Sequence, residues 1–250
     1  MLRTPVSNRI GKRAKVGLDE LFLGPMLRRL DRDLWVTQHP LRFLGAQVGT
    51  RMTVFRLRDG SLLIHSPVPL DQATQAKLDG LGPVRFVVAP NRYHHLFVAE
   101  YARIYPQAKI FGAPGLDSKR KDLRFDAILR QAAPTEWASE IDQTIFQAFP
   151  PLNEVVFFHR SSRTIVFTDL LINVRNSESS YTRLLMWLDG GLGHVAVPRS
   201  FRLLLKMRRA RARETIDQIL SWEFDRLSLA HGEIVERGAK EIVRDAWSFL

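Results

Sequence analysis

Residues 84–95 have the sequence Val-Arg-Phe-Val-Val-Ala-Pro-Asn-Arg-Tyr-His-His, and the two halves of this stretch differ in character. Its first half is an almost wholly apolar run enclosed by Pro83 and Pro90, which is typical of a strand buried on both faces. Its second half is polar and ends in His94 and His95. Loops that follow buried strands are where a rigid sheet presents functional side chains. The stretch therefore predicts a sheet with a histidine-bearing loop at one edge.

The sequence on either side of this stretch alternates between strand and helix patterns. Residues 51–57 and 61–65 are apolar runs joined by Arg58-Asp59-Gly60, and Asp-Gly between two such runs indicates a β-hairpin. A helix is expected over residues 71–81, where Asp71 can cap the first turn. The other elements expected in this half are a strand at 34–36, a helix at 96–105 and a strand at 109–111.

The second half of the chain repeats the strand pattern and ends in helices. Asp169 directly follows one apolar run, and His231 follows another. Residues 173–200 contain several glycines without a clear period, so we expect a flexible insertion or lid there. The strands are expected at 145–149, 154–159, 164–168 and 227–230, and the helices at 214–224 and 239–249.

The order of these elements favours a layered α/β (α+β) fold. A hairpin such as 51–65 needs antiparallel neighbours, which a doubly wound parallel sheet does not provide. A chain of 250 residues is short enough to form one such domain. We therefore expect four αββα layers in a single domain over residues 34–250, preceded by a basic N-terminal extension over residues 1–33.

Polar residues that could bind a metal follow three of the expected strands. They are the pair His94-His95, Asp169 and His231. Imidazoles together with a carboxylate bind zinc, iron or manganese without any sulfur ligand. Each residue also has a purely structural interpretation: a packed or hydrogen-bonded histidine, and for Asp169 a helix N-cap or an Asx-turn.

The order and spacing of four phrases resemble those of the metallo-β-lactamase superfamily. The phrases are Val88-Ala89-Pro90-Asn91 followed by His94-His95, Glu154 to His159, Thr164 to Asp169, and Ala230-His231-Gly232-Glu233. They are similar to the branch called domain of unknown function 4336, and the resemblance extends from about Leu34 to Leu250. It implies the four-layer metallo-β-lactamase-like sandwich with a metal site.

The resemblance also implies that the metal site is reduced. If the superfamily motif His-x-His-x-Asp-His ends at His95, Pro90 and Arg92 replace its first two histidines and His94 replaces its aspartate. A further histidine of the superfamily is absent from residues 150–154. The implied site is therefore mononuclear, with one divalent transition metal, zinc first and iron or manganese as alternatives. The metal ligands it implies are His94, His95, Asp169 and His231, and the catalytic residues are Arg92 and Asp169.

The implied function is that of a metal-dependent hydrolase that acts on a small or anionic substrate. In this hypothesis Arg92 brings a fixed positive charge to the half of the site that lacks imidazoles, whereas in the alternative it points to solvent from a polar turn. We interpret Glu154 as a strand residue that faces solvent, with a carboxylate for the vacant half-site as the alternative. The alternative function is a non-catalytic protein of the same fold that binds an anionic ligand or partner through its basic segment.

The basic segment is one of two places where positive charge is concentrated. The chain has 37 Lys and Arg against 26 Asp and Glu, a formal net charge of +11, and residues 1–18 and 198–213 contain no acidic residue. Helical spacing predicts a positive ridge on one helix face, made of Arg202, Lys206, Arg209 and Arg213. We interpret the two basic stretches as solvated surface. Binding of an anionic ligand or of a membrane surface is the alternative, and binding of nucleic acid is a further one with weaker support.

Several classes of protein are excluded by what the sequence lacks. It has no cysteine, which excludes disulfides, thiolate metal sites and a cysteine nucleophile. No apolar run reaches the roughly 18–20 residues of a membrane span, and the N-terminus lacks the apolar core of a secretory signal, so we expect a cytoplasmic protein. Phosphate-loop, dinucleotide-binding and Gly-x-Ser-x-Gly patterns are also absent.

Overall fold

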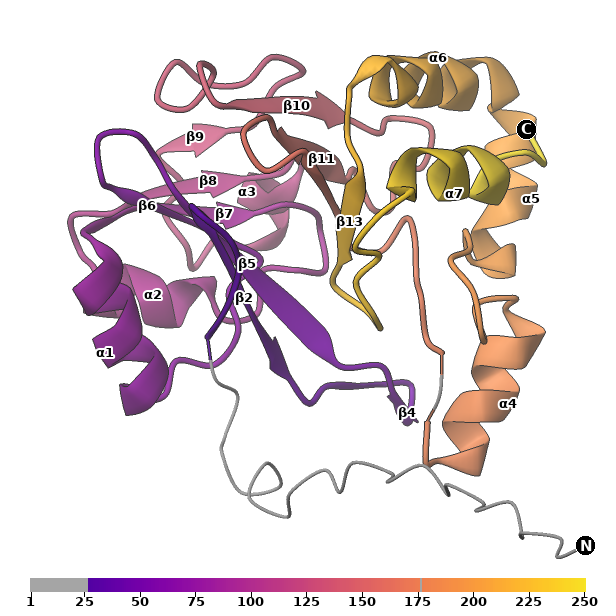
Figure 1. Ribbon diagram of the computed structural model, residues 1–250, viewed down its shortest axis with the longest axis horizontal. Helices are drawn as coiled ribbons and strands as arrows, with labels where there is room; N and C mark the ends of the chain where they lie inside the picture. The colour runs from indigo at the N-terminus through magenta and orange to yellow at the C-terminus, as the bar shows by residue number, and fades with distance from the viewer. Residues whose placement is uncertain (1–26, 176) are drawn as a thin grey trace, which may run out of the picture.

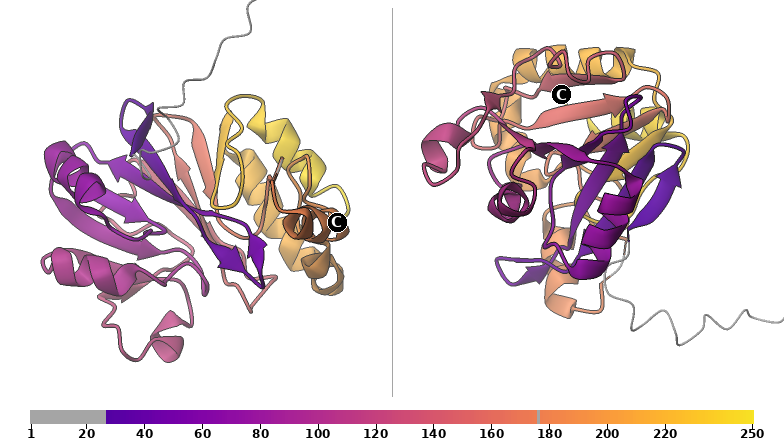
Figure 2. Two further views of the ribbon diagram at one scale, coloured as in Figure 1. Left: turned by 90° about the horizontal axis from the view of Figure 1, so that it is seen from below. Right: turned by 90° about the vertical axis from the view of Figure 1, so that its left-hand side faces the viewer.

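Two β-sheets lie face to face in the computed structural model, and helices cover their outer faces (Figure 1). The structure describes residues 27–175 and 177–250. The basic stretch 1–18, and with it most of the expected N-terminal extension, lies outside the described residues. Figure 2 shows the layers in the order helix, sheet, sheet, helix. This is the αββα arrangement predicted from the sequence.

The larger sheet has seven strands among the described residues, in the order β1-β2-β5-β6-β7-β8-β9. Neighbours from β1 to β6 pair antiparallel, and those from β6 to β9 pair parallel. The predicted turn joins β5 to β6: Asp59 accepts hydrogen bonds from the backbone and hydroxyl of Ser61, and Gly60 has a φ of 83°. The strands are β1 (Arg28–Asp31), β2 (Leu34–His39), β5 (Thr50–Arg56), β6 (Leu62–His65), β7 (Val84–Ala89), β8 (Lys109–Gly112) and β9 (Ala127–Ile128).

The smaller sheet has four strands in the described part of the chain, in the order β10-β11-β12-β13. The first two pairs are antiparallel, and β12 and β13 are parallel. A separate short hairpin is formed by β3 and β4. The bounds are β3 (Arg42–Phe43), β4 (Ala46–Gln47), β10 (Ile141–Ile145), β11 (Val155–His159), β12 (Thr164–Phe167) and β13 (Arg226–Leu229).

The helices lie on both outer faces of the two sheets. In Figure 1, α1 and α2 flank the larger sheet, and α5, α6 and α7 flank the smaller one. Asp71 caps α1 as predicted, since its Oδ1 accepts a hydrogen bond from the Thr74 backbone N–H. None of the described helices is long and apolar enough to cross a membrane. The helices are α1 (Gln72–Leu81), α2 (Val98–Ile104), α3 (Leu116–Lys119), α4 (Ser180–Leu188), α5 (Arg199–Met207), α6 (Arg209–Ser221) and α7 (Ala239–Ala246).

Alternate residues of β11 pack into two different cores. Val155 and Phe157 lie in the core shared with the larger sheet, whereas Val156 and Phe158 pack in the core beneath α6 and α7. Successive side chains of a strand point to opposite faces, so a strand covered on both faces is apolar throughout. The packing of both faces fixes where the loops at the strand ends lie.

Two strands differ from the sequence-based expectation. The strand expected at 145–149 is β10, four residues earlier, because the polar side chain of Gln143 is buried there and donates to the Arg130 and Ala132 carbonyls. β1 lies inside the stretch that we assigned to the N-terminal extension. Its charged sequence suits an edge strand, and Asp31 pairs with Arg226 at 2.7 Å.

Residues 173–200, where we expected a flexible insertion or lid, contain the helix α4, which the sequence analysis did not predict. Ser179 caps it by accepting a hydrogen bond from the Thr182 backbone N–H at 3.2 Å. Met186 packs against Ile172 and Val174. The apolar residues of α4 are consecutive from Leu184 to Leu188, so they show no helical period in the sequence.

The positive ridge predicted on one helix face is divided between two helices. α5 ends before Arg208 and α6 begins after it. The Arg202 guanidinium lies 4.8 Å from the Phe249 ring centre, and Arg209 donates a hydrogen bond to the Leu250 carbonyl at 2.5 Å. Two of the four cations therefore stabilise the C-terminal segment, and the segment 198–213 is not one continuous ridge.

The buried side chain of His159 predicts a pH dependence of stability. Burial lowers the pKa of His159 to about 4 in the folded protein, although Asp33 and Asp31 work in the opposite direction. The unfolded chain, with a histidine pKa near 6.5, then binds a proton that the folded chain does not, so stability falls as the pH falls through this window. When the pH is lowered from about 7 to about 5, protonation of His159 in the unfolded chain should decrease the unfolding free energy by about 2 kcal/mol.

Chemical denaturation of a His159→Gln variant at both pH values checks this. The variant should lose less unfolding free energy on acidification than the unsubstituted protein. A His194→Gln variant, at an exposed position, is the control. Equal acid sensitivity in all three proteins would contradict the prediction.

Candidate metal centre

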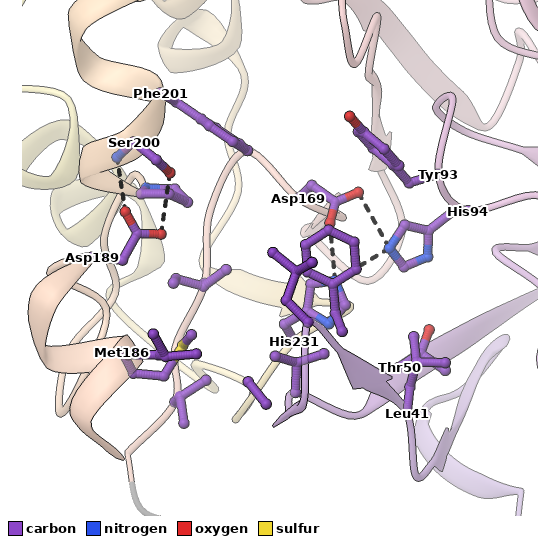
Figure 3. A pocket seen from close by; sticks show the side chains of 18 of the residues that line it. Leu41, Thr50, Tyr93, His94, Asp169, Met186, Asp189, Ser200, Phe201 and His231 are labelled. Carbon is purple, nitrogen blue, oxygen red and sulfur yellow. Dashed lines mark hydrogen bonds and ion pairs between the residues drawn. The ribbon is translucent and has the colours of Figure 1, made fainter. Parts of the chain in front are cut away.

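Three side chains from separate loops meet at the edge of the two sheets. His94 follows β7, Asp169 follows β12, and His231 follows β13. The two histidine Nε2 atoms are 3.3 Å apart, His94 Nε2 is 3.3 Å from Asp169 Oδ2, and His231 Nε2 is 3.0 Å from Asp169 Oδ1. Figure 3 shows the two rings directed toward the carboxylate. We refer to His94, Asp169 and His231 as the cluster.

The outer ring nitrogens of both histidines are held by hydrogen bonds. His231 Nδ1 is 2.8 Å from the Gly49 carbonyl oxygen, which can only accept, so Nδ1 carries a hydrogen and donates it. A neutral His231 therefore presents the lone pair of Nε2 to the cluster. His94 Nδ1 is 2.7 Å from the Ser66 hydroxyl. Such outer partners are what orient histidine ligands in metal sites.

Asn91 connects the loop that carries His94 to Asp169. Its side-chain oxygen accepts hydrogen bonds from the backbone N–H groups of Tyr93 and His94, both at 2.8 Å. Its amide nitrogen donates to Asp169 Oδ2 at 2.5 Å and to the Thr168 hydroxyl at 2.7 Å. One buried amide therefore fixes two members of the cluster relative to each other.

Glu154 is fully buried, so the expectation that it faces solvent was wrong. Its carboxylate accepts hydrogen bonds from the backbone N–H groups of Thr168 at 2.7 Å, Asp169 at 2.7 Å and Leu170 at 3.1 Å. Burial and the charge of Asp169 raise the pKa of Glu154, and these N–H donors oppose the rise. Glu154 thus positions the backbone that carries Asp169.

The charges in the cluster favour an ionised aspartate. Burial by itself would raise the pKa of Asp169, but His94 and His231 outweigh this and hold it well below its usual range. Burial by itself would lower the pKa of His231, but the Asp169 carboxylate outweighs this and raises it. A carboxylate here requires positive charge beside it, from a proton on an imidazole or from a metal ion.

The cluster fits a metal ion by donor type and by spacing. One atom from each of the three residues lies within 4.8 Å of the other two. Ligand atoms about 2.0–2.1 Å from a tetrahedral zinc stand roughly 3.3 Å from one another, which is close to the separations of 3.0 and 3.3 Å observed here. The group His94, Asp169 and His231 can therefore hold a metal ion.

The structure does not bring His95 into the cluster. Its ring Nδ1 lies 2.8 Å from Arg120 Nη1. Burial, together with the positive charges of Lys119 and Arg120, lowers the pKa of His95 to about 4. The side chains of the two adjacent histidines diverge, so that His94 points toward Asp169 and His231, and His95 points toward the side chain of Arg120.

Arg92 lies beside Gly115, and in the described part of the chain it has no hydrogen bond or ion pair with the cluster. A side chain at Gly115 would lie 3.6 Å from Arg92 Nε, which is buried without a hydrogen-bond partner. Among the described residues, no carboxylate forms an ion pair with Arg92. Its backbone N–H donates to the Leu152 carbonyl at 3.0 Å, and the Val155 N–H donates to the Pro90 carbonyl at 2.8 Å. Backbone pairing therefore joins the two segments in which ligands of a second metal are missing.

A cavity of about 980 Å³ opens above the cluster. Its apolar lining comes from segments whose proximity the sequence did not predict: the β3–β4 hairpin, residues 172–174, α4 and the start of α5. Figure 3 shows Met186 and Phe201 facing Tyr93 and Leu41 across it. The signal that sequence reasoning missed is the apolar run 184–188, which belongs to α4.

The buried carboxylate of Glu154 can be tested by a single substitution. Glu154→Gln places an amide N–H₂ against backbone donors, and the lost hydrogen bonds should lower the unfolding free energy by about 2–4 kcal/mol. Glu140→Gln is the matched control, because Glu140 accepts from the Arg58 backbone N–H at the surface; it should cost less than about 1 kcal/mol. Denaturant titration measures both, and equal effects would contradict the role of Glu154.

Comparisons with known proteins agree with this architecture. The DIM-1 metallo-beta-lactamase exposed to ceftazidime has a TM-score of 0.62 at 11% identity, over 90% of this chain and 96% of that one. The metallo beta lactamase from Hirschia baltica has a TM-score of 0.58 at 11% identity, over 91% and 98%. The metal-soaked Flv1 flavodiiron core from Synechocystis sp. PCC6803 has a TM-score of 0.61 at 12% identity, over 87% and 58%.

At these identities the likeness shows the fold alone, and no curated protein matches the chain. A family model with the description Domain of unknown function (DUF4336) matches residues 32–186, which is more than half of the chain. The chain has the metallo-β-lactamase fold, and it belongs to the family described as domain of unknown function DUF4336.

Proposed function

We propose that this protein is a metal-dependent hydrolase that binds one divalent metal ion, zinc, through His94, Asp169 and His231. The observation that supports the proposal is the convergence of their donor atoms, 3.0 to 3.3 Å apart, at the floor of a cavity. His95 is not part of the proposed ligand set, and Arg92 has no catalytic role in it. Two imidazoles and one carboxylate are ligands that suit zinc and leave a coordination position open.

When bound, such a metal supplies Lewis-acid chemistry: it polarises a substrate oxygen and lowers the pKa of water. The residues of the chain hold the site in place for it. Gly49 and Ser66 orient the two rings, and Asn91 fixes Asp169. The walls of the cavity are mostly apolar, and an apolar surrounding strengthens electrostatic interactions at the polar floor.

A single metal is supported by the residues around the cluster. Among the described residues, only this one group of metal-binding side chains meets the spacing required. The positions where a second set of ligands would lie are held by backbone hydrogen bonds, from Arg92 to Leu152 and from Val155 to Pro90. The carboxylate of Glu154 is occupied by three backbone donors and is not available as a ligand.

Binding of a partner through the basic segment 198–213 is less well supported. Arg202 and Arg209 make contacts within the chain, to Phe249 and Leu250. The cations that remain exposed are on two helices rather than on one face. We therefore keep the hydrolase as the proposed function.

The adjacent histidines provide a matched test of the metal site. His94→Ala removes a proposed ligand, whereas His95→Ala removes a neighbour that faces Arg120. Metal analysis of purified, zinc-equilibrated protein should find about one ion per chain in the unsubstituted protein and in His95→Ala, with at least roughly tenfold weaker affinity in His94→Ala and His231→Ala. Equal metal content in all four proteins would contradict the proposed site.

Hydrolysis is tested with a panel of chromogenic esters and phosphoesters. A chelator should abolish activity, and added zinc should restore it in the unsubstituted protein but not in His231→Ala, since that variant lacks a ligand. His95→Ala is again the control and should retain activity. Activity that persists in His231→Ala after chelation would refute a metal-dependent reaction at this site.

A further inference from the structure

The cavity above the cluster has an apolar wall that belongs to neither of the two main cores. Ile172, Val174 and Met186 form a small separate cluster, with Val48 and Leu185 packed against it. All five of these side chains line the cavity. These apolar side chains thus join the loop after β12, the helix α4 and the end of the β3–β4 hairpin into one apolar surface on the side of the cavity.

The volume of the cavity, about 980 Å³, is at the upper end of the range for small-molecule sites. A metal ion and a water molecule need only a small part of it. Apolar surface that stays open to a cavity gains free energy when a hydrocarbon covers it. The wall therefore suits a ligand with a long hydrocarbon part.

The opposite end of the cavity carries an uncompensated positive charge at Lys119. Its Nζ donates to the Arg92 carbonyl at 2.5 Å and lies 5.1 Å from the ring centre of Tyr93. Among the described residues, no carboxylate forms an ion pair with Lys119 or with Arg92, which adds positive charge beside it, whereas Arg120 is paired with Asp122 at 2.6 Å. An anionic group is favoured at this end.

We propose that the cavity binds an amphiphile, a long-chain acyl compound whose hydrocarbon chain lies along the Ile172–Met186 wall and whose anionic head lies at Lys119. In Figure 3 the cluster lies between Met186 on one side and Tyr93, on which Lys119 rests, on the other. The bond to be hydrolysed then lies at the cluster, between chain and head. Only this position of the bond rests on the proposed function, because binding of the chain and head needs no metal.

A homologous series of straight-chain carboxylates tests the inference by calorimetry on the full-length protein, with and without a chelator. Each buried CH₂ should strengthen binding about three- to fourfold until the cavity is filled. A metal that binds the carboxylate would raise all affinities together and leave this increment unchanged. An affinity that does not rise with chain length would overturn the proposal.

Substitutions at two neighbouring residues of α4 distinguish binding inside the cavity from binding at the protein surface. Leu185 is half-buried and lines the cavity, whereas Leu184 is 52% exposed and does not. Leu185→Glu should weaken binding of the longest carboxylate at least tenfold, and Leu184→Glu should change it less than about twofold. Leu185→Trp fills the cavity with an apolar ring and should shorten the chain length at which affinity stops rising, which provides a test if Leu185→Glu does not fold.

The head group is tested by Lys119→Gln, with Lys121→Gln as the control because Lys121 does not line the cavity. Lys119→Gln should weaken the binding of carboxylates several-fold and leave the binding of the alcohols of the same chain length unchanged.

Equal losses of affinity in Leu184→Glu and Leu185→Glu would show binding on the exposed face of α4 and overturn the proposal. The two proposals can fail separately. If affinity rises with chain length in chelated protein while no variant binds metal, the amphiphile site is supported and the proposed metal-dependent hydrolase is refuted.

Discussion

The hydrogen bond from Asn91 Nδ2 to Asp169 Oδ2, 2.5 Å long, joins the two sheets at the edge where the cluster lies. Asn91 follows a strand of the larger sheet, and Asp169 follows a strand of the smaller one. The same amide group orders the loop that presents His94. The arrangement of the site therefore depends on the face-to-face packing of the sheets, which places Asn91 and Asp169 within hydrogen-bond distance.

The charge of Asp169 imposes a second requirement on this edge. A carboxylate removed from water is stable only beside positive charge and hydrogen-bond donors. Asn91 and the backbone N–H groups held by Glu154 organise the loop, and the two imidazoles supply the positive charge, either by protonation or by binding a metal with Asp169. With Nδ1 donating to the Gly49 carbonyl, a neutral His231 has its Nε2 lone pair directed into the cluster, which is the form that a metal ligand requires.

Much of the framework could be predicted from local patterns. The turn at Asp59-Gly60, the Asp71 cap and the buried strand 84–89 each follow from short-range chemistry, and the structure confirms them. Positions at strand ends also pointed to His94, Asp169 and His231, because loops that follow buried strands are where a rigid sheet presents functional side chains. Local sequence patterns were sufficient to predict those features that a segment of a few residues determines by itself.

The remaining features depend on contacts between distant segments. The divergence of His94 and His95 is decided by Arg120, and the burial of Glu154 by the loop after β12; neither partner adjoins these residues in sequence. Helix α4 has consecutive rather than periodic apolar residues, so only its packing against Ile172 and Val174 reveals it. The cavity could not be predicted for the same reason, since its walls come from many separate segments of the chain.

An anomalous difference map from zinc-equilibrated crystals, recorded at the zinc absorption edge, shows whether His94, Asp169 and His231 hold one metal ion. We expect one peak per chain, in contact with His94 Nε2, His231 Nε2 and the Asp169 carboxylate. A second peak beside Arg92 and residues 150–154, a peak bound to His95, or no peak at the cluster would contradict this expectation.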